Sequence, residues 1–269
     1  MMAQVFVAKL FVISILMEAA RLGQTASTPK IRAAQVNGTQ SSTLQIPEGR
    51  VFNGRDAQLT ESPWLVLILL PTTYCGGAII TETHVLTAAH CFDDYVTGPI
   101  KVIAGFLSPK EHTVNHIQLH ELYAIGSEDT NYDLAILKVA PEFEFTTEVY
   151  PVKLPVQGVE VRGSVAVYGF GNTHTEPGPV KIPQTAILTV IPSSQCRYPA
   201  NIICTEANQK GVCPGDSGGP VVQSGPDGVV LVGIISAGGS LCGNPPLLPY
   251  DLHVNVAAHI SWILQHLSP

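Results

Sequence analysis

Short apolar runs separated by glycine and proline dominate this chain, and helical spacing is scarce. Runs of strand length occur at 64–70, 75–80, 84–87, 101–105 and 117–125. The 24 glycines and 21 prolines punctuate them in the way that tight turns require. The pattern predicts an all-β protein.

Two features divide this pattern into parts. A linker rich in proline and acidic residues, 141–155, separates one strand-rich half at about 51–145 from another at about 146–254. Near the C-terminus, apolar residues at 256, 260, 263, 264 and 267 have helical spacing. They predict a helix at about 255–267 with Trp262 facing inward.

The first fifty residues have a different character. Lys9 precedes an apolar run, 10–17, which is too short to span a bilayer and fits a secretory signal peptide over about 1–24. Two segments, 18–20 and 25–27, compete as its cleavage site. Residues 25–50 are polar and predict a pro-segment, which carries at Asn37 the chain's only N-glycosylation sequon. Because no other stretch could cross a membrane, we expect a secreted, extracellular protein.

Composition and charge narrow the functional classes. The 269 residues are 45% apolar and 13% charged, which is ample for a buried core. The net charge is −7, and beyond residue 50 it is −10, from 9 Lys/Arg against 19 Asp/Glu. A body this acidic is a poor partner for nucleic acid or for an anionic membrane surface.

The cysteine count points to disulfides. Six cysteines in a chain with a secretory start predict a disulfide framework, although the sequence by itself allows fifteen pairings. No C-x-x-C pair, the usual mark of a zinc site, occurs.

Three segments carry candidate chemistry. Ser217 lies in Gly-Asp-Ser-Gly-Gly-Pro, where glycines allow a tight bend and close approach to another molecule. A serine hydroxyl is a weak nucleophile until a base takes its proton. His90 lies in Thr-Ala-Ala-His-Cys, and Asp133 heads the apolar run Leu-Ala-Ile-Leu. Each segment alone is typical of an ordinary loop or turn, but the three together are not.

In the order His, Asp, Ser, these segments resemble the trypsin/chymotrypsin family of serine endopeptidases from about Arg50 to the C-terminus. The resemblance implies two six-stranded antiparallel β-barrels with the active site between them and a C-terminal helix. It implies acyl transfer, with Ser217 as nucleophile, His90 as general base and Asp133 orienting the histidine. The N–H groups of Gly215 and Ser217 would form the oxyanion hole, and Ser236 would hydrogen-bond Asp133.

The resemblance also implies the covalent framework. The expected disulfides are Cys75–Cys91, Cys196–Cys204 and Cys213–Cys242. Activation would follow cleavage after Arg50, because the new ammonium of Val51 would pair with the buried carboxylate of Asp216.

The implied substrate pocket has no charged floor. It would be lined by Gly211, Ser236, Gly238 and Leu248. A carboxylate at 211 would select Arg or Lys, but Gly211 has none, so we expect cleavage after apolar or small residues. Asp251 lies nearby in sequence, but the alignment of Tyr250 with the family pattern predicts that it stays outside the pocket. An enzyme that rejects arginine would need a separate trypsin-like protease to cut after Arg50.

The remaining expectations concern partners. Phe106 stands where a family calcium loop would begin with an acidic ligand, so we expect no metal there, and nothing calls for a cofactor. We expect a monomer whose partners are protein or peptide substrates, an activating protease and protein protease inhibitors. The alternative function is a catalytically silent binding protein on the same scaffold.

Overall fold

The computed structural model describes residues 51, 53–58, 60–93, 98–126, 129–171, 179–207, 210–238 and 249–267. The chain divides into two compact units, Met1–Gln45 and Ile46–Pro269, and all described residues belong to the second. The predicted signal peptide, the pro-segment with Asn37 and Arg50, and two later residues, Cys242 and Leu248, lie outside the described residues.

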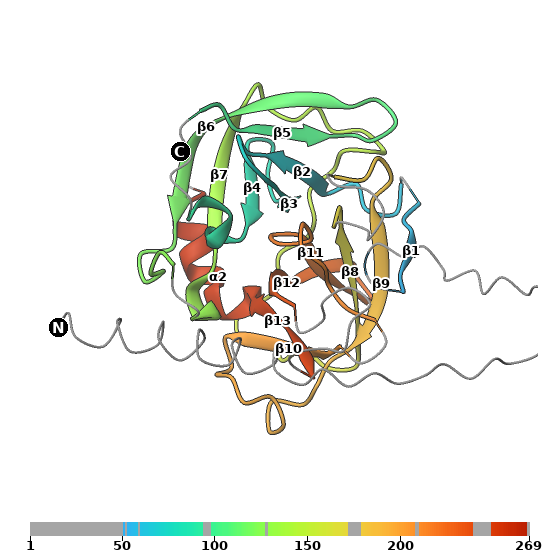
Figure 1. Ribbon diagram of the computed structural model, residues 1–269, viewed down its shortest axis with the longest axis vertical. Helices are drawn as coiled ribbons and strands as arrows, with labels where there is room; N and C mark the ends of the chain where they lie inside the picture. Colours follow the sequence, from blue (N-terminus) through green and yellow to red (C-terminus); the bar gives the residue numbers. More distant parts are fainter. Residues whose placement is uncertain are drawn as a thin grey trace, which may run out of the picture. The chain divides into compact units, whose positions relative to one another are not determined.

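The first half forms a closed antiparallel barrel, in the strand order β2-β3-β4-β7-β6-β5 (Figure 1). Its strands are β2 (Leu65–Leu69), β3 (Tyr74–Ile79), β4 (His84–Thr87), β5 (Lys101–Ala104), β6 (Lys110–Leu119) and β7 (Ala135–Ala140). All four residues of β4 are buried, as expected for a strand covered on both faces. The predicted six-stranded barrel is confirmed for this half.

The second half forms a seven-stranded antiparallel sheet in the order β1-β9-β8-β11-β12-β13-β10. Its strands are β1 (Arg55–Asp56), β8 (Ser164–Gly169), β9 (Gln184–Thr189), β10 (Ile202–Glu206), β11 (Pro220–Gly225), β12 (Gly228–Ala237) and β13 (Tyr250–Asn255). The prediction of a second closed six-stranded barrel is therefore wrong in detail.

The structure shows why this curled sheet does not close with a full ladder. Beyond β9, one isolated bridge joins Val190 to Thr205 of β10, and the N–H of Ile191 donates to the Cys204 carbonyl at 2.8 Å. Pro192 follows, and because proline has no backbone N–H it cannot extend the pairing. The two edges of the sheet meet over two residues only.

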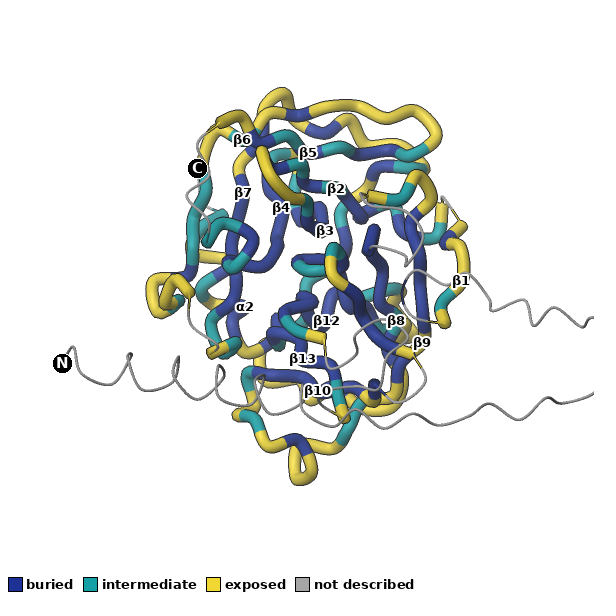
Figure 2. Tube along the Cα trace, viewed as in Figure 1, coloured by how far each residue is buried: buried dark blue, intermediate teal, exposed yellow. Residues whose placement is uncertain are grey.

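One apolar core joins both halves. Its buried members come from the closed barrel, from the second sheet and from the C-terminal helix. Trp64 packs edge-on against Tyr168 with ring centroids 6.4 Å apart, and Phe106 lies 5.1 Å from Phe170. Figure 2 shows residues buried along the inner strands such as β4, β7 and β12, whereas β1 and much of β6 are exposed or half-buried. The halves are thus held as a packed scaffold on which loops can be placed accurately.

The C-terminal helix α2 (Val256–Gln265) begins at Asn255, whose side chain accepts a hydrogen bond from the N–H of Ala257 at 3.1 Å. The predicted helix is confirmed. Trp262 is only half-buried and its indole N–H donates to Glu121, whereas Ile263 is fully buried. Within the described residues, no helix is long and apolar enough to cross a membrane.

Candidate active site

His90 sits in a short 3-10 helix, η1 (Ala89–Phe92), directly after β4. The Cys75–Cys91 disulfide ties this helix to β3, with Cα atoms 6.4 Å apart. The neighbouring residue His90 is therefore fixed on the rim of the closed barrel.

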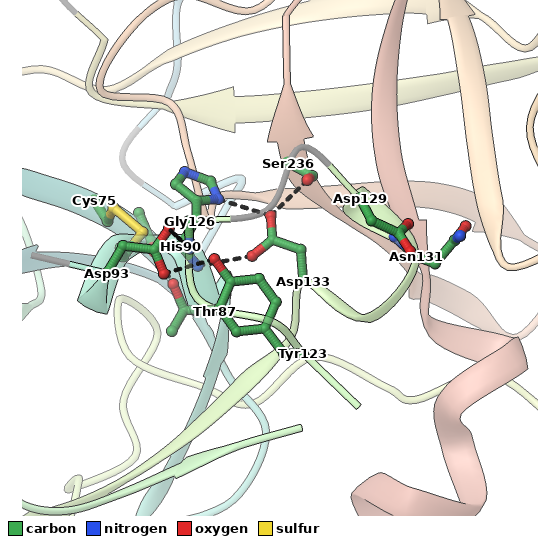
Figure 3. A network of polar contacts seen from close by, with 12 residues as sticks. Cys75, Thr87, His90, Asp93, Tyr123, Gly126, Asp129, Asn131, Asp133 and Ser236 are labelled. Carbon is green, nitrogen blue, oxygen red and sulfur yellow. Dashed lines mark hydrogen bonds and ion pairs between the residues drawn. A yellow bond between two sulfur atoms is a disulfide. The ribbon is translucent and has the colours of Figure 1, made fainter. Parts of the chain in front are cut away.

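Asp133 caps a second 3-10 helix, η2 (Thr130–Tyr132), and its carboxylate meets three donors. The backbone N–H of His90 donates to Oδ1 at 2.8 Å, His90 Nδ1 lies 2.7 Å from Oδ2, and the Ser236 hydroxyl donates to Oδ2 at 2.5 Å. Figure 3 shows both side-chain contacts converging on this carboxylate. The predicted hydrogen bond from Ser236 to Asp133 is confirmed.

This arrangement fixes the protonation of the imidazole. An ionised carboxylate only accepts, so Nδ1 of His90 must carry the proton and Nε2 of the neutral ring is left as an acceptor. Burial lowers the pKa of His90, but the hydrogen bond and charge of Asp133, helped by Asp93, outweigh it and leave the pKa raised. A general base needs an available nitrogen, and this tautomer leaves Nε2 of His90 free to accept a proton.

Asp93 and Tyr123 also lie in this network, and the sequence did not predict either of them. The hydroxyl of Tyr123 donates to Asp93 Oδ1 at 2.7 Å, and the N–H of Gly126 donates to Oδ2 at 3.3 Å. Burial, this hydrogen bond and the charges of Asp133 and Asp93 all raise the pKa of Tyr123. The only sequence signal for this contact between Tyr123 and Asp93 is that Asp93 lies three residues after His90.

A cavity of about 250 Å³ opens beside this network. Its lining residues are His90, Tyr123, Asp129, Thr130, Asp133, Ser236 and Ala237. The cavity borders the imidazole of His90 and is open to solvent on one side, as a substrate subsite would be.

The loop of Ser217 is anchored on the closed barrel. The carbonyl of Ser217 accepts from the N–H of Gly76 on β3 at 2.7 Å, and the N–H of Gly218 donates to the Ile235 carbonyl at 2.8 Å. Gly218 has φ +77°, and a Cβ there would lie 2.5 Å from the Gly76 carbonyl and 3.2 Å from the N–H of Ala88. The structure thus brings the Ser217 backbone against the segment that leads into His90.

Gly215, the other predicted oxyanion-hole residue, has φ +94°. A Cβ there would lie 2.6 Å from the ring of Tyr74, so a glycine is needed for both conformation and space. Burial and the charge of Asp216 raise the pKa of Tyr74 to about 12, which keeps this phenol neutral.

Asp216 is completely buried beside the Ser217 loop. Its Oδ1 accepts from the N–H of Gly171 at 2.7 Å and its Oδ2 from the N–H of Cys213 at 2.8 Å. Burial raises the pKa of Asp216 to about 7, the two backbone bonds oppose this, and the charge of Asp251 adds to it. The carboxylate therefore sits where a nearby cation would stabilise its charged form.

Val51 is also fully buried, among the apolar side chains of the second sheet. Its carbonyl accepts from the N–H of Gly54 at 2.6 Å. The residue after the predicted cleavage point is thus already inserted in the fold.

The segments predicted to form the pocket floor lie together, with the carboxylate of Asp251 beside them. Gly211 is buried, and a Cβ on Gly238 would lie 2.9 Å from the Val212 carbonyl, which places these segments together. Asp251 is completely buried and its Oδ2 accepts from the N–H of Val212 at 2.9 Å. Asp251 of β13 therefore lies beside the residue that follows Gly211, closer to the predicted pocket floor than its position in the sequence suggested.

Two of the three expected disulfides are confirmed. Cys75–Cys91 and Cys196–Cys204 are both present. Cys213 is also disulfide-bonded, and its expected partner, Cys242, lies outside the described residues.

The chain matches the trypsin family model over residues 51–263. It is 30% identical to a venom serine protease of Polistes dominula over 224 residues, 73% of this chain and 79% of that protein. It is 30% identical to trypsin-1 of Astacus astacus over 237 residues, which are 79% of this chain and 98% of that protein. It is 33% identical to the lectizyme of Glossina austeni over 227 residues, which are 74% of this chain and 80% of that protein. The chain belongs to the trypsin family, and it is a serine endopeptidase.

Proposed function

We propose that this protein is a secreted zymogen that becomes an active endopeptidase when the bond after Arg50 is cut. The observation that carries this proposal is the contact of Asp133 with both His90 and Ser236, at 2.7 and 2.5 Å. This contact serves to hold an imidazole ready for proton transfer, which a purely binding protein would not need.

The chemistry follows from the roles of these groups. Ser217 Oγ attacks the peptide carbonyl, His90 Nε2 takes its proton and then delivers it to the leaving amine, and Asp133 stabilises the charged imidazole. The N–H groups of Gly215 and Ser217 receive the developing negative charge on the carbonyl oxygen. Losing one such donor typically costs about 2.7–4 kcal/mol of transition-state stabilisation. A water molecule, deprotonated by His90, then attacks the acyl-enzyme carbonyl, which releases the acyl group as an acid and returns the proton to Ser217.

Activation would act on the same loop. Cleavage after Arg50 gives Val51 an α-ammonium, and we propose that it pairs with Asp216 and orders the Ser217 loop. The raised pKa of Asp216 supports this, since a buried carboxylate gains most from a cationic partner.

The substrate pocket accepts apolar or small side chains at P1, the residue whose carbonyl is attacked. Gly211 and Gly238 project no side chains into it, and burying an apolar P1 side chain contributes about 1.5–3 kcal/mol. Basic P1 side chains are excluded on this proposal, because Gly211 offers no carboxylate to pair with them.

The remaining parts of the proposal rest on sequence and family. Secretion follows from the predicted signal peptide at 1–24, and the relative from Polistes dominula is named a venom protease. Protein substrates and protein protease inhibitors are the partners that a trypsin-family enzyme would meet.

The test is hydrolysis of a mixed peptide library by the purified full-length chain, before and after a limited cut at the Arg50 bond. Matched variants are Arg50→Gln, which blocks the cut, and Ser217→Ala, which leaves it intact. We expect activity only in cut protein that retains Ser217. Full activity in uncut Arg50→Gln, or none in correctly cut wild type, would refute the proposal.

A further inference from the structure

A cavity of about 210 Å³ lies on the second sheet, and none of its described lining residues takes part in the proposed chemistry. It is built on β1, β9 and β8, which are neighbours in that order at one edge of the sheet (Figure 1). Arg55 of β1 pairs with Thr185 of β9, and Thr185 pairs with Tyr168 of β8. Residues paired directly across neighbouring strands share a face, so these three form a row along the cavity. Ile187, two residues further along β9, lies on the same face and is 56% exposed.

The cavity has a positive character in an acidic protein. Among the described residues that line it, Arg55 and Lys210 are cationic and none is acidic. The guanidinium of Arg55 has five N–H donors, and three of them go to the Asp56 carbonyl at 2.9 Å and to the two oxygens of Glu61 at 3.0 Å. Two donors, on Nε and Nη2, have no partner in the described part of the chain. They form one edge of the guanidinium, which is the fork that binds a carboxylate with two parallel hydrogen bonds.

A buried hydroxyl group at the same place lacks a partner. Thr185 is 2% exposed, and its Oγ1 has no hydrogen-bond partner of ordinary geometry among the described residues. Burial and the charge of Glu61 raise the pKa of the facing Tyr168, against the opposing effects of Thr185 and Arg55, so this phenol stays neutral. Because an unsatisfied buried hydroxyl is costly, a ligand atom that accepts from Thr185 would be stabilised there.

We propose that this cavity is a second binding site, which takes a carboxylate carried on a short apolar chain, such as the C-terminal residue of a peptide. The carboxylate would bind the free edge of Arg55 and the ammonium of Lys210, and it would accept from Thr185. The apolar chain would cover the exposed side chain of Ile187. Drug-sized ligands occupy pockets of about 300–1,000 Å³, so this smaller cavity suits a single residue.

The cavity adjoins the segment that follows the activation bond. The N–H of Gly54 donates to the Val51 carbonyl at 2.6 Å, and a Cβ on Gly54 would lie 2.6 Å from the Thr185 carbonyl. A ligand stabilises the form to which it binds, so one that holds Arg55 against β9 favours the arrangement with Val51 inserted.

This position gives the site a role in regulation, and that role, unlike the binding itself, rests on the proposed function. Cleavage after an apolar P1 residue releases a peptide that ends in an apolar side chain and a new carboxylate. The product would therefore bind the second site and promote the active form of the Ser217 loop.

The first experiment measures binding to the uncut full-length chain carrying Ser217→Ala, followed by NMR titration. The probe is N-acetyl-leucine. N-acetyl-leucinamide has the same apolar chain without the charge, and inorganic phosphate has the charge without the chain. We expect N-acetyl-leucine to bind at one site with a millimolar Kd, and both comparison compounds to bind about tenfold more weakly or not at all.

Matched variants assign the binding to this cavity. Lys210→Gln removes a cation and should raise the Kd for N-acetyl-leucine about tenfold. Thr185→Val keeps the shape of the side chain without its hydroxyl and should raise the Kd about fivefold. Lys138→Gln makes the same charge change on an exposed residue of β7 that does not line the cavity, and it should leave the Kd unchanged.

The second experiment tests regulation in protein cut after Arg50. It measures the rate at which a serine-reactive phosphonate labels Ser217, with and without N-acetyl-leucine. We expect faster labelling with N-acetyl-leucine in wild type and in Lys138→Gln, and no change in Lys210→Gln.

The possible outcomes are distinct. Equal binding of N-acetyl-leucine and its amide, tighter binding of phosphate, or an unchanged Kd in both Lys210→Gln and Thr185→Val would overturn the site. Binding that leaves the labelling rate unchanged would overturn the regulatory role. Absence of labelling under every condition in correctly cut wild type would instead refute the proposed endopeptidase, while the titrations of the uncut chain would still decide the binding site.

Discussion

Replacing Ser236 with alanine removes one of the three donors to Asp133 while leaving both contacts to His90. A hydrogen bond to a charged group contributes about 1.5–3 kcal/mol, which corresponds to about 10- to 150-fold in rate. The cavity of about 250 Å³ is lined by both Ser236 and Asp133, so a water molecule can take over part of the lost bond. We therefore expect kcat to fall about 10- to 30-fold, with KM nearly unchanged, because Ser236 positions the base without touching the reacting atoms.

The pH profile separates this effect from a general loss of structure. The serine hydroxyl partly neutralises Asp133, so its removal strengthens the pull of the carboxylate on the imidazolium and raises the pKa of His90 further. The acidic limb of kcat/KM should move to higher pH in Ser236→Ala. Ser224→Ala, an exposed position on β11, should change neither rate nor profile. A kcat within twofold of wild type, or a loss confined to KM, would refute the positioning role.

Three further predictions follow from the same contacts. The pKa of His90 is raised above 6.5 and the ring must be neutral to act, so kcat/KM should fall as pH drops, with a midpoint above 6.5; a midpoint below 6 would contradict this. In the uncut chain the pKa of Asp216 is raised from 3.8 to about 7. The free energy of unfolding in urea should therefore decrease as the pH rises from about 4 to 7, and Asp216→Asn should remove that decrease. Gly218→Ala should lower the free energy of unfolding by about 2 kcal/mol more than Gly163→Ala does. Both glycines have φ near +77°, but only at Gly218 would an added Cβ meet close neighbours. Equal thermal stabilities of the two variants would contradict this.

The sequence predicted those parts of the site that lie in short, self-contained motifs. His90, Asp133 and Ser217 each sit in a segment whose residue types define its chemistry, and the structure brings His90 and Asp133 into direct contact. Ser236 could also be predicted, through its match to the family pattern after the apolar run Gly233-Ile234-Ile235, although it lies at a bulge in β12.

The missed features depend on distances between segments that no local pattern encodes. The position of Asp251 is set by the register of β13 against β10 and by the bulge between Ile235 and Ala237 on β12. A shift of one residue would turn Asp251 to the other face. The incomplete closure of the second sheet depends likewise on where Pro192 falls relative to the end of β9. Tyr123 and Asp93 meet across thirty residues that carry no motif.

The most direct test of the central claim is mass spectrometry of the chain after reaction with a fluorophosphonate. The account predicts one covalent adduct, on Ser217, in protein cut after Arg50. It predicts little or none in uncut Arg50→Gln, and none in cut Ser217→Ala. Equal labelling of cut and uncut protein would contradict activation through Val51 and Asp216, and an unlabelled Ser217 in correctly cut, folded protein would contradict catalysis.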